Sequence, residues 1–196
     1  MATAKKAAKK SATVKKAAAS KTPKRGKVST AAKKPYPENT GDNTKPPKSR
    51  PADAVDLLSD DHSAAGKIFK QFEKLMDKGG SAAEKKALAD QVCGMLIVHT
   101  TLEEEIFYPA ARAAGLDADM MDEAKIEHAS AKLLIAQIKA GRPGQDQYEA
   151  KVKVLADYVQ HHVVEEQTEM FPKCRRSTMD LIGLRKQMAD RKAQLS

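Results

Sequence analysis

The chain has 196 residues, enough for one domain of ordinary size and some extra chain. Its formal net charge is +9, from 35 Lys and Arg residues against 26 Asp and Glu residues. No stretch approaches the roughly 20 apolar residues of a membrane span, and two cysteines do not make a disulfide framework. These features argue against a membrane protein and predict a cytoplasmic location.

The charge is distributed unevenly along the chain. Residues 1–50 carry fifteen bases and two acids, a net charge of +13, whereas the remaining residues carry twenty bases and twenty-four acids, a net charge of −4. The first fifty residues also contain five of the nine prolines and no Leu, Ile or Phe. Such a segment has too little apolar surface to offset the entropy of ordering. We therefore expect residues 1–51 to form a disordered Lys/Ala/Pro-rich tail.

From about residue 51 apolar residues recur at steps of three and four, which predicts helices with one buried seam each. The first predicted helix ends at the glycine pair 79–80. Ser81 and Glu84 then form a capping box for the second helix. Pro109 is expected to stop or bend that helix.

The third predicted helix begins near residues 117–119 and is ended by the glycines and the proline of residues 141–144. The fourth begins near Gln145, and Pro172 is expected to close it. A shorter segment at residues 178–194 is expected to cover one end of the other helices.

Together the elements predict an all-α fold, an antiparallel up-down-up-down four-helix bundle, because no segment has the alternation of a strand. We expect the bundle to span residues 52–175. A short C-terminal helix is expected within residues 176–196.

Two segments of the chain repeat each other: HTTLEEEIFYP at residues 99–109 and HVVEEQTEMFP at residues 162–172. Each begins with an HxxxE pair and ends with an aromatic residue followed by proline. Residues four apart lie one turn apart on the same face of a helix, so each pair directs an imidazole and a carboxylate at one spot. Both groups are metal ligands.

The first and third helices each carry one histidine in the apolar seam, His62 and His128. At about 1.5 Å per residue, the four histidines and the two glutamates of the HxxxE pairs reach one level of an antiparallel bundle. Two buried carboxylates require a balancing cation, and no buried Lys or Arg is evident. The predicted metal ligands are His62, His99, Glu103, His128, His162 and Glu166.

A second HxxxE pair, His161 and Glu165, overlaps the last pair of predicted ligands. Helical register favours His162 and Glu166, because they share a face with Val159, whereas His161 is turned about 100° away.

Other polar residues near the predicted site are interpreted as bystanders. Glu104, Glu105 and Glu165 are expected to be solvated surface charges, with the orienting of ligands as the alternative. Cys174 lies among basic residues that could lower its thiol pKa, but an inert surface cysteine is favoured. Tyr158 is expected to pack, with the donation of its hydroxyl to a small ligand as the alternative.

The order H, HxxxE, H, HxxxE on four helices resembles the hemerythrin-like HHE cation-binding domain over residues 52–175. The resemblance implies a non-haem di-iron centre in which Glu103 and Glu166 bridge the two irons. It implies as terminal ligands His62, His99, His128 and His162. Lys132 stands where the oxygen-carrying hemerythrins place a further histidine, which implies open coordination positions.

Such open positions suit the binding or turnover of O2, peroxide or NO. An iron-responsive sensor without turnover is the alternative, and the sequence leaves open whether the protein is an enzyme.

The tail has a resemblance of its own. Its basic stretches AKKAAKK, KTPKRGK and AAKKP are similar to the Lys-Ala-Pro tails of linker histones, which implies non-specific DNA binding by residues 1–50 through phosphate charge. A solubilising arm is an equal alternative. A mitochondrial transit peptide is a minor option, because such peptides favour Arg and the tail has almost only Lys.

Overall fold

The computed structural model of the chain describes residues 50–145 and 147–195. The expected tail, apart from its last two positions, lies outside this part of the chain. Within these ranges the chain is helical and contains no strand, which confirms the all-α prediction. No helix within them is long and apolar enough to span a membrane.

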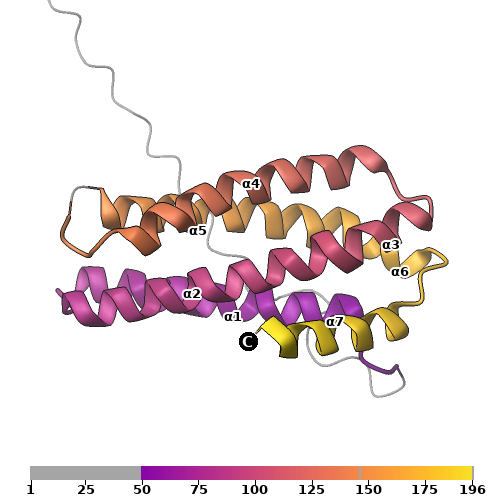
Figure 1. Cartoon of the computed structure of the whole chain (residues 1–196), viewed down its shortest axis with the longest axis horizontal. Helices are drawn as coiled ribbons and strands as arrows, with labels where there is room; N and C mark the ends of the chain where they lie inside the picture. Colours follow the sequence, from indigo (N-terminus) through magenta and orange to yellow (C-terminus); the bar gives the residue numbers. More distant parts are fainter. Residues whose placement is uncertain (1–49, 146, 196) are drawn as a thin grey trace, which may run out of the picture. The chain divides into compact units, whose positions relative to one another are not determined.

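Four long helices form a bundle (Figure 1): α1 (Ala54–Asp77), α2 (Ala82–Leu102), α4 (Ala118–Ala140) and α5 (Tyr148–Glu165). α1 packs against α2 and α4 against α5, while contacts of α2 with α4 and of α1 with α5 close the bundle. The colours in Figure 1 run in opposite directions along consecutive long helices.

The helix ends follow from local sequence signals. Asp53 caps α1 and Ser81 caps α2, each in a capping box with the acid three positions later. Gly79 follows α1 with a φ of 69°, a left-handed conformation that glycine adopts without steric cost. Asp117 caps α4, and Gly141 ends it. The starts expected for the second and third helices are therefore confirmed.

The prolines do not end their helices. α2 continues through a π-helical turn, η1 (Glu103–Phe107), into α3 (Tyr108–Ala113). α5 continues in the same way through η2 (Glu166–Met170) into α6 (Phe171–Arg176). The expectation that Pro172 closes the fourth helix was therefore wrong.

The π-helical turns explain how the helices continue past Pro109 and Pro172. A proline ring lacks the backbone donor and clashes with the carbonyl four residues earlier in an α-helix. In the wider turn, the backbone N–H of Tyr108 donates to the carbonyl of Glu103, five residues earlier. The N–H of Phe171 donates to the carbonyl of Glu166 at the same spacing.

The last helix, α7 (Leu181–Leu195), packs against α1, α2 and η1. Figure 1 shows it in yellow, beside one end of α1. Leu184 and Met188 are buried in that contact. The segment expected at residues 178–194 is therefore a helix that lies lengthwise along α1 near one end of the bundle.

Two apolar clusters flank a single polar layer in the bundle. The first cluster contains Leu58 and Leu102, and the second contains Ala65 and Leu155. His62 falls between the two clusters along α1 and is 4% exposed. Because such a layer is shielded from water, its charges must be balanced within it.

Candidate metal centre

The structure brings all six residues predicted as ligands into the polar layer. Their exposed fractions run from 0% to 7%, so every one of them is buried. Six different elements supply them: His62 from α1, His99 from α2, Glu103 from η1, His128 from α4, His162 from α5 and Glu166 from η2. Their role as metal ligands stays a prediction.

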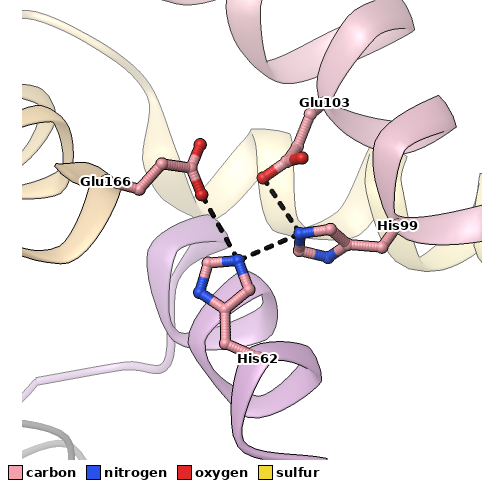
Figure 2. A group of neighbouring side chains, drawn as sticks. All are labelled: His62, His99, Glu103 and Glu166. Carbon is pink, nitrogen blue, oxygen red and sulfur yellow. Dashed lines mark hydrogen bonds and ion pairs between the residues drawn. The ribbon is translucent and has the colours of Figure 1, made fainter. Parts of the chain in front are cut away.

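One ligand group, drawn in Figure 2, consists of His62, His99, Glu103 and Glu166. The Nε2 atoms of the two histidines are 3.0 Å apart. Glu103 Oε1 lies 3.2 Å from His99 Nε2, and Glu166 Oε2 lies 3.3 Å from His62 Nε2. One atom from each of the four residues lies within 4.8 Å of the others, close enough to surround a single cation.

The second group consists of Glu103, His128 and His162. The Nε2 atoms of these histidines are 3.1 Å apart, and Glu103 Oε2 lies 3.4 Å from that of His128. Glu166 Oε2 lies 3.5 Å from His162 Nε2. Both glutamates thus stand between the two histidine pairs, as bridging carboxylates would.

The aromatic residues that follow the two π-helical turns pack on the site. Tyr108 stacks on His128 with ring centroids 5.7 Å apart, and Phe171 stacks on His62 at 5.8 Å. The Tyr108 hydroxyl also donates a hydrogen bond to Glu166 Oε1 over 3.0 Å. Phe171 has no hydroxyl, so the two halves of the repeat differ at this point.

Glu104 is not the solvated charge that was expected. Its Oε1 lies 2.9 Å from His128 Nδ1, and its Oε2 lies 2.7 Å from the Lys132 ammonium. A carboxylate behind an imidazole fixes the tautomer with Nδ1 protonated and leaves the Nε2 lone pair to a cation. The alternative role of Glu104, the orienting of a ligand, therefore fits the structure. Glu105 is exposed, as expected, and pairs with Arg191.

Sequence reasoning missed two further carboxylates behind the histidines. Glu127 Oε2 lies 2.8 Å from His162 Nδ1, and Asp61 Oδ2 lies 3.6 Å from His99 Nδ1. Each of these acids directly precedes the seam histidine of its own helix and faces the histidine of the next long helix in the chain. An acid one position before each seam histidine was the signal that could have revealed them.

Burial dominates the titration of one histidine in each pair. It lowers the pKa of His62 well below the ordinary value, and the charge of His99 acts in the same direction. It lowers the pKa of His128 to about 3 despite the opposing charge of Glu103. Both imidazoles are therefore neutral at physiological pH.

Carboxylates dominate the titration of the other two histidines. Burial acts to lower the pKa of His99, but Glu103 and Asp61 outweigh it and raise the pKa to about 10. Burial is likewise outweighed at His162, where the charge of Glu166 and the hydrogen bond that His162 donates to Glu127 raise the pKa to about 9. Without metal, each histidine pair thus carries one positive charge, in the place where a bound cation would otherwise face the carboxylates.

The residues of the layer fit a metal centre. Among the described residues, both oxygens of Glu103 and Oε2 of Glu166 are buried acceptors without a hydrogen-bond partner. Buried acceptors of this kind require a donor or a cation. Imidazole and carboxylate together suit iron, manganese or zinc.

A small cavity adjoins the histidines. Its volume is about 30 Å³, enough for a water-sized molecule. Tyr158, for which packing was expected, is 49% exposed at the cavity wall. Most of the remaining wall is apolar, including Leu96, Ala131 and Ile135.

Cys174 is not at the surface, contrary to expectation. It is fully buried, and burial, together with the charge of Glu166, raises the pKa of its thiol to about 12. A thiol with so high a pKa is a poor nucleophile. The expectation that the residue is inert therefore agrees with the structure.

Comparisons with known proteins agree with this architecture. The family described as Hemerythrin HHE cation binding domain matches residues 53–174. The crystal structure of a hemerythrin HHE cation binding domain-containing protein from Mycobacterium kansasii has a similar fold, with a TM-score of 0.62 and 21% sequence identity over 74% of this chain and 88% of that chain. A protein of Nostoc sp. named DNA nickase is 28% identical over 116 residues, which are 59% of this chain but only 32% of that protein.

Proposed function

Because the chain belongs to the hemerythrin HHE cation-binding family, we propose that its polar layer holds a non-haem di-iron centre that handles O2, peroxide or NO. One observation carries the proposal. Glu103 contributes one oxygen to each ligand group, so two cations would share it. Glu166 would be the second bridge, and the terminal ligands would be His62, His99, His128 and His162.

The choice of a small ligand rests on the number of protein ligands and on the size of the adjoining cavity. Lys132 pairs with Glu104 and contributes no imidazole, so the group around His128 has fewer ligands than a fully coordinated iron needs. The adjoining cavity of about 30 Å³ admits only small molecules. When bound, iron supplies redox chemistry at its open positions. Carboxylates at the Nδ1 atoms of the histidines orient the imidazoles, and the apolar clusters exclude water. The Tyr108 hydroxyl donates a hydrogen bond to Glu166, the proposed second bridge.

The test is the metal content of protein purified in air. We expect about two irons per chain and the near-ultraviolet absorption of an oxo-bridged iron pair. Glu103→Ala should remove the iron, whereas Glu105→Ala, two positions later and exposed, should keep it. Zinc alone, or no metal, would overturn the proposal.

A second candidate is an iron-responsive module without turnover. It is favoured by the two carboxylates buried in the layer, because a cation bound there would stabilise the folded bundle strongly. The chelated protein would then unfold at a much lower temperature than the iron-loaded protein. Similar melting of the two forms, with steady consumption of peroxide, would favour the enzyme.

We further propose that residues 1–50 bind DNA without sequence preference. The support is the charge of +13 on these residues, against −4 on the rest of the chain. The Nostoc relative is named a DNA nickase, which gives DNA a further reason to be tested as a partner. Binding of this kind would hold the iron centre close to DNA.

A further inference from the structure

The second HxxxE pair of the sequence lies outside the buried centre and has a third partner. His161 Nε2 lies 3.2 Å from Glu165 Oε1 on the same helix and 3.6 Å from Glu127 Oε1 on α4. One atom of each residue lies within 4.8 Å of the other two. The side chains of His161 and Glu165 are 65% and 40% exposed, so ions reach them from solvent.

Glu127 connects this outer group to the buried centre. Its Oε1 faces His161, while its Oε2 accepts a hydrogen bond from Nδ1 of the buried ligand His162. The two histidines are neighbours in sequence and point to different sides of the same carboxylate. Glu127 would therefore contact both a cation on the outer group and the buried residue His162 of the inner site.

An acidic pocket of about 120 Å³ runs from the same surface to the centre. Five glutamates line it: Glu123, Glu127, Glu165, Glu166 and Glu169. Glu166 belongs to its wall and is 1% exposed, with an Oε2 that accepts no hydrogen bond within the described part of the chain. The pocket thus joins exposed carboxylates to a buried carboxylate of the centre.

We propose that Glu127, His161 and Glu165 form an outer site for a divalent cation, from which the cation passes through the acidic pocket to the buried centre. One imidazole and two carboxylates suit Fe²⁺ or Mn²⁺, with water completing the coordination. Three protein ligands, with His161 open to solvent, hold the ion weakly, so it exchanges quickly. The proposal rests on the proposed function only for the identity of the cargo, Fe²⁺.

The outer site is tested with Mn²⁺ added to the iron-loaded full chain. We expect one weak Mn²⁺ site, detected by the electron paramagnetic resonance signal of the free ion, that is lost in His161→Ala. Glu149→Gln removes one charge from the far end of the same helix and should leave the site intact. If His161 only forms an ion pair with its two acids, the loaded wild-type protein binds no Mn²⁺ there, and the outer site is refuted.

The passage of the ion is tested by the rate of iron loading. A charged pocket concentrates ions and raises their entry rate, so we expect His161→Ala and Glu169→Gln to load Fe²⁺ about tenfold more slowly. Both variants should reach the iron content of the wild type at equilibrium, because neither residue belongs to the buried centre. Unchanged loading rates would refute the route, whereas a lack of iron in the wild type would refute the proposed function instead.

Discussion

The Tyr108 hydroxyl donates a hydrogen bond over 3.0 Å to Oε1 of Glu166, which belongs to the other half of the internal repeat. The matching aromatic residue, Phe171, makes no such bond and instead stacks on His62 and meets Phe107 edge-on. Oε2 of the same carboxylate faces the histidines. Tyr108 therefore positions Glu166, one of the two carboxylates proposed as bridges, while Glu103 is held without a hydroxyl.

Replacing Tyr108 with Phe should destabilise the protein because Glu166 Oε1 would keep its burial but lose its donor. We expect a loss of about 1.5 kcal/mol in the free energy of unfolding of the chelated protein. Urea denaturation followed by circular dichroism measures this loss. Tyr158→Phe, at a half-exposed tyrosine, is the control, and equal midpoints for the two variants would contradict the positioning role.

Replacing Asp61 with Asn should weaken metal binding at the first ligand group. Asp61 stands behind His99, and carboxylates in this position raise the basicity of the imidazole and fix its orientation. We expect iron affinity to fall by about 10- to 100-fold, measured by competition with a chelator. Asp60→Asn, at the exposed neighbouring residue, should leave the affinity unchanged, and an equal loss in both variants would count against the orienting role of Asp61.

Metal binding should release protons in proportion to the number of charged imidazoles. The pKa of His99 is raised to about 10 and that of His162 to about 9, so both bind a proton at pH 7 in the metal-free protein. His62 and His128 have lowered pKa values and contribute none. We therefore expect the release of about two protons per chain at pH 7.

The sign of the pH dependence follows from the same two groups. Because their folded-state pKa values are raised, their contribution to the stability of the metal-free protein is complete below pH 6.5 and is lost as the pH rises through about 9 to 10. Proton release should fall toward zero over that upper range. Calorimetry in buffers of different ionisation enthalpy measures the release, and a constant value up to pH 11 would refute the assignment.

Deletion of residues 1–50 should abolish DNA binding and leave the metal content unchanged. If the tail binds by charge, the affinity of the full chain should fall about 10³-fold or more between 50 and 200 mM salt, with little preference for sequence. Gel-shift assays at two salt concentrations measure this. Equal binding by both forms, or no binding by either at low salt, would leave the segment as a solubilising extension.

The six clustered residues could be predicted because their spacing is set by local geometry. His99 and Glu103 lie four apart on one helix, and a capping box fixes where that helix begins. The positions of Asp61 and Glu127 depend instead on how neighbouring helices are rotated against each other. Seam periodicity says nothing about that rotation, so these two acids were missed.

The continuation of the helix past Pro109 could also not be predicted from local sequence signals. A proline usually ends a helix, but here Tyr108 and Phe107 are fully buried in the core. Their burial favours a continued helix, and the π-helical turn is the backbone solution that permits it. Tertiary packing therefore overrode a strong local signal.

Each half of the bundle contributes one carboxylate to the ligand group around the histidines of the other half. Glu103, from the first half, reaches His128 in the second, and Glu166 reaches back to His62. Neither helical hairpin alone contains a complete ligand group, whereas two copies of one hairpin placed face to face would contain both. Internal duplication of a self-associating hairpin is thus a natural origin for the chain, and the two fragments produced by a cut between α3 and α4 should reassemble when iron is added.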